Sequence, residues 1–448
     1  MVYDGQKYDL HFQVQTVWEP QASLQGLPRM NSSTATSPPV QFPATWASVH
    51  FDLLRGLAAF FVLFEHWRNL FFVDYPHIVA YRFPFAVFYA LASAGHQSVI
   101  LFFVLSGYFI GGTVFRSVER NQWTWSGYLL RRLVRLWTVL VPTLLLCLFW
   151  DRLGIHLRIA PALYTGHVAN NMVGDVAPAL TARVFFGNLF FLQSILTSVF
   201  GSNGALWSLA NEFWYYLLFP LGLIALWRTG RPLYRLLCAV LFVITAWFIG
   251  RAMFLAFPIW LAGVVLFKLP PPAFSPRTAR YLRVGSSLLY IPIFFAFGRL
   301  PWIAGNNRDY LLTVITTLFL WILLSANTPH TSHSRAVRAS REFARFSYTL
   351  YAAHVPFLVF LTALIVVDSR WYPNTRTLTL GLAPLLAALI YSWVLAFLTE
   401  FRTDTLRQRL EHLFGLATLP SPLPSNPLAE SPNPHVTESP SDISSPAR

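Results

Sequence analysis

The first candidate for chemistry is a pair of ionisable residues inside an apolar run. Residues 51–72 read FDLLRGLAAFFVLFEHWRNLFF, with Arg55 near the start and His66 beyond the middle. Arg55 and His66 are eleven residues apart, which in an α-helix is about 16 Å along the axis and a return to the same face. Ionisable groups at membrane depth are costly unless they face a bundle interior or a watery cavity. This face therefore predicts a functional site, with a guanidinium at one level and an imidazole at another.

These residue types suggest group transfer onto an alcohol. A histidine with a near-neutral pKa suits removal of a proton from a hydroxyl. Arg131, Arg132 and Arg135 begin another apolar run. Such clusters ordinarily mark membrane topology, but they also suit an anionic, phosphate-bearing donor. Secondary transport of an anionic or sugar-like solute is the alternative, because proton-coupled carriers also bury histidine, glutamate and arginine. Carriers usually show a repeated half, and this sequence shows none.

Two further apolar runs carry polar residues. Glu212 follows Ser208 by four positions, so the two share a helix face with Asn211 beside them. This carboxylate lies at a water interface or takes part in a site, for example by orienting a base. Ser106 lies in the run LFFVLSG. It either serves helix packing together with the glycine that follows or lines a cavity.

A later run combines two tyrosines, a histidine and a proline. Tyr348, Tyr351 and His354 recur at three-residue spacing on one broad face. Pro356 has no N–H for the carbonyl of Ala352, so we expect a kink there and a free acceptor. In a bilayer a buried histidine is a candidate for function as well as for structure.

The composition defines the class of protein. The 448 residues are 55% hydrophobic, 17% aromatic and only 12% charged, far from the quarter charged that is typical of soluble proteins. The net charge of +14 comes in short clusters between apolar runs, which indicates membrane topology and no nucleic-acid partner. The sequence contains no metal-ligand spacing or disulfide framework, and Cys147 and Cys238 each lie inside an apolar run.

The charge pattern decides how many apolar runs cross the membrane. Eleven runs are candidates, and the basic clusters all face the cytoplasm only if one run between residues 151 and 227 does not cross. The weakest is 183–199, which Asn188, Gln193 and Ser194 interrupt. We therefore predict an all-α, polytopic transmembrane helical bundle of about ten spans in the plasma or inner membrane, with both termini in the cytoplasm.

The two ends of the sequence differ from its middle. Residues 1–48 and 403–448 are predicted as disordered tails around a transmembrane region at 49–402, because the last stretch in particular is rich in proline and serine. Met30 opens a low-complexity stretch and is an alternative translation start. No soluble catalytic domain is expected, so the chemistry falls to the membrane bundle.

Five motifs occur together in this order: Arg55 with His66 eleven positions later, FFVLSG at 102–107, RRLVRLWTVLVP at 131–142, LWSLANEFWYY at 206–216 and SYTLYAAHVP at 347–356. In this combination the chain resembles the integral-membrane acyltransferase 3 family over residues 50–400. The resemblance implies about ten transmembrane helices and a cytosolic acyl-CoA donor, most often acetyl-CoA. It also implies a carbohydrate, cell-surface glycan or glycolipid acceptor.

The resemblance also assigns roles to residues. His66 would be the catalytic residue. Our hypothesis is that it acts as general base on the acceptor hydroxyl or as a covalent carrier of the acyl group, with Glu212 as the better candidate to orient it. The coenzyme phosphates would bind the arginines Arg55, Arg131, Arg132 and Arg135. Ser106, Glu212 and His354 would line the pocket. From their spacing on the same helix faces, we add four pocket residues: Ser208, Asn211, Tyr348 and Tyr351. No metal is expected. This chain departs from relatives that carry a fused periplasmic domain, which implies direct transfer to the acceptor or a separate partner.

Overall fold

A computed structural model describes residues 45–79, 81–168, 172–227, 230–299, 306–326, 335–367 and 369–415. In these ranges the chain is helical, and its β-structure is limited to isolated bridges such as Phe72 with Trp371. The expected disordered tails lie outside the described residues for 1–44 and 416–448. The all-α class predicted from the apolar runs is confirmed.

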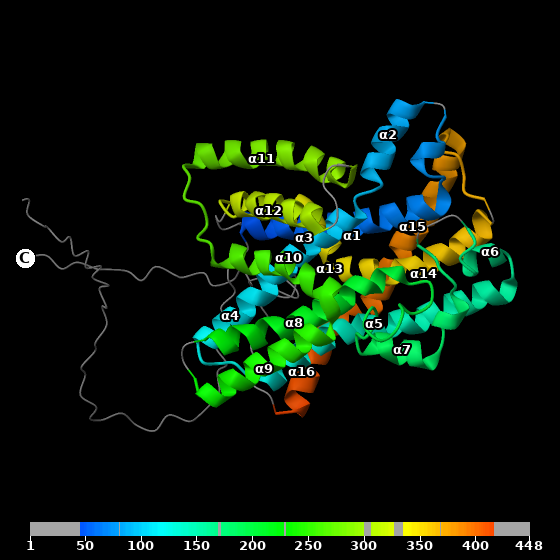
Figure 1. The fold of residues 1–448 in the computed structure, drawn as a ribbon. Helices are drawn as coiled ribbons and strands as arrows, with labels where there is room; N and C mark the ends of the chain where they lie inside the picture. Colours follow the sequence, from blue (N-terminus) through cyan, green and yellow to red (C-terminus); the bar gives the residue numbers. More distant parts are fainter. Residues whose placement is uncertain are drawn as a thin grey trace, which may run out of the picture. The chain divides into compact units, whose positions relative to one another are not determined.

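Long helices stand where the spans were predicted (Figure 1). They are α1 (Trp46–Phe71), α3 (Gly95–Ser106) continuing through a π-helical turn (Gly107–Gly111) into α4 (Gly112–Glu119), α5 (Trp125–Leu157), α8 (Trp207–Leu226), α9 (Pro232–Phe248), α10 (Gly250–Lys268), α11 (Pro276–Ala296), α12 (Asn306–Leu323), α14 (Ser347–Ile365) and α15 (Thr375–Leu398). Shorter helices connect them: α2 (Arg82–Leu91), α6 (Pro161–Tyr164), α7 (Ala182–Leu189), α13 (Arg335–Arg345) and α16 (Thr403–Leu413). Within the described ranges, 7 helical segments are long and apolar enough to cross a membrane, so the chain is a multi-pass membrane protein.

The run at 183–199 has the structure expected of a segment that does not cross. Helix α7 has 8 residues, or about 12 Å of rise, which is too short for a bilayer. The chain then turns, with positive φ at Phe191 and Ser194. The Asn188 amide donates to the Val184 and Ser198 carbonyls, both at 2.9 Å, and Gln193 Nε2 donates to the Leu206 carbonyl at 2.9 Å. The polar residues that weaken the run as a span therefore stabilise its turns.

Helix α14 packs against α1, α5 and α15. It is buried along nearly its whole length, as expected of a helix that is apolar on all sides. Pro356 leaves the Ala352 carbonyl without its helical donor, and Asn203 Nδ2 donates to that carbonyl at 2.8 Å. The free acceptor predicted from Pro356 is thus present, and a loop side chain binds it.

A buried carboxylate fixes the loop that supplies Asn203. Asp151 is fully buried on α5 and accepts hydrogen bonds from the backbone N–H of Ser202 at 2.8 Å and from its hydroxyl at 2.7 Å. Removing this side chain leaves two buried donors without a partner. We expect Asp151→Ala to lower the free energy of unfolding by about 2–3 kcal/mol, measured by thermal unfolding in lipid nanodiscs.

The matched control for this change is Asp175→Ala, because Asp175 is exposed. It removes the same carboxylate from a loop surface, and surface substitutions usually change stability by less than about 0.5 kcal/mol. Equal unfolding temperatures for the two variants would contradict the structural role of Asp151.

The beginning of the predicted C-terminal tail is ordered, contrary to the expected disorder of residues 403–448. Residues 403–413 form helix α16, which packs on α5. Its Glu411 is fully buried and lies 3.3 Å from Arg131, between Oε1 and Nη1. The segment is too polar for a span, and so the sequence alone assigns it to the tail. The helix is stabilised by this ion pair and by contact with α5. Neither interaction can be recognised from apolar residues in the sequence.

Candidate functional site

Two histidines from different helices form the centre of the site. His66 on α1 and His354 on α14 are 288 positions apart, yet His66 Nδ1 lies 2.8 Å from His354 Nε2. The second nitrogen of His354, Nδ1, lies 2.6 Å from the carbonyl oxygen of Leu350. His354 is fully buried, so its ring is fixed from both sides. Contact between α1 and α14 thus creates a pair of rings that neither helix contains alone.

The partners of these nitrogens determine where the protons are. A carbonyl oxygen can only accept, so His354 Nδ1 carries a proton. In the neutral ring of His354, Nε2 then has the lone pair and accepts a hydrogen bond from His66 Nδ1–H. The remaining nitrogen, His66 Nε2, keeps its own lone pair. The arrangement therefore prepares His66 Nε2 as a base or nucleophile.

His66 lines a cavity of about 420 Å³. The size is within the range typical of small-molecule sites. The lining residues are Glu65, His66, Arg68, Asn69, Asp74, Met172 and Arg370. Arg55 is not among them, and Ala59 and Val62, which lie between Arg55 and His66 on α1, are buried. The cavity therefore belongs to the C-terminal end of α1.

Sequence reasoning missed most of this lining. Asn69, Asp74 and Arg370 lie at or beyond helix ends and match no motif. The available signal was Arg68, a charge close to His66 in an apolar run. Glu65 accepts a hydrogen bond from the backbone N–H of Gly95 at the start of α3, where the helix dipole favours a negative charge.

Glu212 lies in a different cluster. Ser106 Oγ donates to Glu212 Oε1 at 2.8 Å, the Tyr216 hydroxyl also donates to Oε1, and Trp260 Nε1 donates to Ser106 Oγ at 3.1 Å. The helix carrying Ser106 approaches α10 closely, because a Cβ on Gly107 would lie 1.9 Å from the Trp260 carbonyl oxygen. Among the described residues, His354 and not Glu212 is therefore the hydrogen-bond partner of His66.

The four candidate donor-binding arginines are not equivalent. Arg135 Nη2 lies 2.6 Å from Glu400 Oε1, Arg131 Nη1 lies 3.3 Å from Glu411 Oε1, and Arg55 Nη1 lies 3.8 Å from Asp52 Oδ1. Arg132 has no acidic partner in the part of the chain that the structure describes. Its guanidinium lies 5.9 Å from the centre of the Tyr128 ring and 6.0 Å from that of Tyr216, and its buried Nε has no hydrogen-bond partner. Arg132 is thus the arginine most available to an anion.

The remaining candidate residues lie outside the cavity at His66. The hydroxyl of Tyr351 is hydrogen-bonded to the Ser208 hydroxyl and donates to the Ala205 carbonyl at 3.1 Å. The Tyr348 hydroxyl donates to the Leu136 carbonyl at 3.2 Å. Asn211 lines a second cavity of about 540 Å³. Of the predicted site residues, the structure brings His66 and His354 together, and it places the others in neighbouring clusters.

Comparison with known proteins adds to this geometry. A family model described as an acyltransferase domain matches residues 49–399, most of the chain. An uncharacterized protein of Haemophilus influenzae (strain ATCC 51907 / DSM 11121 / KW20 / Rd) is 28% identical over 149 residues, which are 32% of this chain and 54% of that protein. The chain thus spans about half the length of this relative. No solved structure matches the chain.

Proposed function

Since the chain belongs to the acyltransferase 3 family, we propose that it is a membrane O-acyltransferase. It transfers an acyl group, acetyl in the first instance, from acyl-CoA to a hydroxyl of a sugar, a cell-surface glycan or a lipid-linked acceptor. The observation that carries this proposal is the lone pair of His66 Nε2 at a polar cavity, held in place by the His354 contact at 2.8 Å.

The chemistry requires one base and one leaving group. His66 Nε2 removes the proton of the acceptor hydroxyl as the oxygen attacks the thioester carbonyl. The new C–O bond forms, the C–S bond breaks, and the proton ends on the sulfur of the free thiol. In the covalent variant Nε2 attacks the thioester first and the alcohol then takes the acyl group from the ring. Both routes need the same unprotonated nitrogen.

The donor is proposed to bind at the other end of α1. Helix α1 runs from Trp46 to Phe71, so Arg55 precedes His66 by about 16 Å along the axis. Arg135, in the N-terminal part of α5, and Thr349, in the first turn of α14, both bond to Glu400. This places the N-terminal parts of the two helices close together. We assign this arginine-rich end to the cytoplasm, where acyl-CoA occurs, with the protein in the plasma or inner membrane and both termini inside.

Arg132 gives this assignment a specific test. Arg132→Gln is expected to raise the KM for acetyl-CoA about tenfold, because it removes one charge-assisted contact to a phosphate. The KM for S-acetylpantetheine, which carries the thioester without the phosphates, is expected to stay the same. The measurement is steady-state kinetics with both donors.

The matched control for Arg132→Gln is Arg152→Gln. Arg152 also lies on α5 but is exposed and remote from the N-terminal end of that helix. A variant at Arg132 with an unchanged KM for acetyl-CoA, or with equal losses for both donors, would contradict the phosphate contact.

The overall proposal is tested by thiol release. We expect the purified protein in liposomes to release free CoA thiol from acetyl-CoA and to transfer the labelled acetyl group to an acceptor fraction extracted from bacterial envelopes. Uptake of labelled solute into the liposomes without thiol release would instead support secondary transport.

A further inference from the structure

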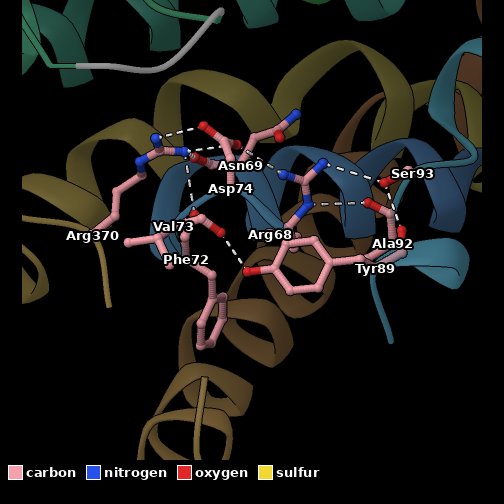
Figure 2. Close-up of polar contacts among 9 residues, drawn as sticks. All are labelled: Arg68, Asn69, Phe72, Val73, Asp74, Tyr89, Ala92, Ser93 and Arg370. Carbon is pink, nitrogen blue, oxygen red and sulfur yellow. Dashed lines mark hydrogen bonds and ion pairs between the residues drawn. The ribbon is translucent and has the colours of Figure 1, made fainter. Parts of the chain in front are cut away.

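The cavity at His66 contains a carboxylate held by two guanidinium groups (Figure 2). Arg370 binds Asp74 with both terminal nitrogens, Nη2 to Oδ2 at 2.8 Å and Nη1 to Oδ1 at 3.2 Å. Arg68 Nη1 lies 3.4 Å from the same Oδ1. Asp74 follows α1, Arg68 lies in its last turn and Arg370 follows α14. The two helices that supply the histidines thus also supply this charged group.

The two arginines are largely buried and hydrogen-bonded within the protein, whereas the carboxylate is partly exposed. Arg370 Nη1 also donates to the carbonyls of Asn69 and Phe72, both at 3.3 Å. Arg68 donates to the Ala92 carbonyl at 3.4 Å and to the Ser93 hydroxyl at 3.3 Å. The side chains of Arg68 and Arg370 are 10% and 8% exposed, while that of Asp74 is 46% exposed. Of the three charged side chains of this group, the carboxylate of Asp74 is therefore the one most accessible to a ligand.

This arrangement has a defined preference for ligands. An ionised carboxylate accepts hydrogen bonds and repels anions, so it favours hydroxyl donors. The hydrogen bond from Arg370 holds the pKa of Asp74 below its ordinary value, which keeps the group ionised at neutral pH. The Asn69 side chain also lines the cavity and can donate and accept. The described lining carries two positive and two negative side chains, Arg68 and Arg370 against Glu65 and Asp74, so it offers no excess of positive charge to an acidic ligand.

We infer that this cavity is the acceptor site and that it selects an uncharged polyhydroxyl group, such as a neutral sugar ring. One hydroxyl lies at His66 Nε2 and its neighbours bind Asp74 and Asn69. The inference rests on the proposed function, because it names the acceptor class for the same histidine. The sugar is either free or the headgroup of a lipid, since the same hydroxyl chemistry serves both.

The test compares neutral sugars with their acidic counterparts. The probes are the methyl glycosides of glucose, galactose and mannose, the methyl glycosides of the three corresponding uronic acids, and vesicles that contain glucosyl diacylglycerol. The full-length protein in nanodiscs receives acetyl-CoA, and both thiol release and acetylated product are measured. We expect each accepted neutral sugar to have a kcat/KM at least about tenfold above that of its uronate. Activity with the vesicles alone would assign the lipid-borne source, and activity with the methyl glycosides would assign the free sugar.

Two variants separate ligand binding from structure. Asp74→Asn is expected to raise the KM of the neutral sugar about tenfold and to lower that of the uronate, because it removes both the strong acceptor and the repulsion. If Asp74 had only a structural role, the change would raise the KM of the neutral sugar and the KM of the uronate alike. Asn69→Ala is expected to raise the KM of the neutral sugar with little change in kcat. Asn69 belongs to α1, and its side chain makes no hydrogen bond to the described residues, so its removal should not disturb the helix. Asp175→Asn, on an exposed loop outside the cavity, is the matched control and should change neither KM.

Each other result has a defined meaning. A uronate that is the better substrate of its pair, or variants at Asp74 and Asn69 that behave like Asp175→Asn, would overturn the inference. Thiol release with transfer to none of the sugars or vesicles would overturn the polyhydroxyl assignment and leave acyl transfer standing. A wild-type protein that releases no thiol under any condition would instead contradict the proposed function itself.

Discussion

His66→Ala is expected to reduce acyl transfer by about a thousandfold, within the range that a positioned base contributes. The reason is the state of this ring: Nδ1 is bonded to His354 at 2.8 Å, which leaves Nε2 free on a residue that lines the cavity. Alanine removes both the base and the possible acyl carrier, so either route is blocked. The measurement is product formation by the purified variant in nanodiscs, at saturating acetyl-CoA and acceptor.

The control for this change must show that the protein still folds and that the loss belongs to this one imidazole. His156→Ala removes an exposed imidazole from α5 and should retain wild-type activity. The thermal unfolding profile of His66→Ala should remain cooperative, since the ring is partly exposed. Activity within tenfold of wild type in a folded His66→Ala protein would disprove the central role of this residue.

His354→Ala is expected to lower kcat about a hundredfold and to leave the KM of the acceptor nearly unchanged. His354 does not line the cavity. It accepts a hydrogen bond from His66 Nδ1–H and so fixes which nitrogen of His66 carries the free lone pair. Without it the His66 ring can take the other tautomer or rotate, and the fraction of molecules with an available Nε2 falls. A positioning residue of this kind changes the rate of the chemical step more than substrate binding.

Coupling between the two histidines provides a sharper test. Groups that act as a unit are strongly non-additive, so the double variant His66→Ala/His354→Ala should be no less active than His66→Ala. His354→Gln keeps an acceptor near the position of Nε2 and should recover part of the lost activity. In a double-mutant cycle of His66→Ala with Glu212→Gln, the two losses of activation free energy should be additive. The reason is that Glu212 bonds to Ser106 and Tyr216 and not to His66. Non-additive losses with Glu212 and additive losses with His354 would instead assign Glu212 as the residue that positions His66.

Local patterns made much of the fold predictable. The long helices follow from the apolar runs, and the short α7 follows from the polar residues that interrupt 183–199. Pro356 indicates that the carbonyl of Ala352 lacks its helical donor, although not that Asn203 supplies another. In each case the physical cause acts within a few residues of the chain. His66 was found for the same reason, because an imidazole inside a span is conspicuous without knowledge of its neighbours.

The rest of the site depends on contacts between distant segments. Nothing in the sequence pairs His354 with His66 across 288 positions, so Glu212 was an equally reasonable partner. The arginines cannot be ranked without knowing that Glu400 and Glu411 return from the C-terminal end to bind Arg135 and Arg131. Asp74 and Arg370 belong to irregular segments that carry no periodicity. They are recognisable as an ion pair only once the segments that follow α1 and α14 are seen to lie together.

The carbonyl of Leu350, which closes the inner end of the histidine pair, has a consequence for proton balance. A peptide oxygen cannot pass a proton onward, so a proton taken up by His66 has no exit through His354 and must leave by the face where it entered. There it meets the departing thiolate. Since a thioester and an alcohol become an ester and a thiol, the complete turnover neither releases protons to the medium nor takes them up. Hydrolysis of the same thioester by water sets free one acid equivalent as carboxylic acid. A weakly buffered reaction followed with a pH electrode should therefore stay level during productive turnover and drift to acid only when the acyl group is lost to water.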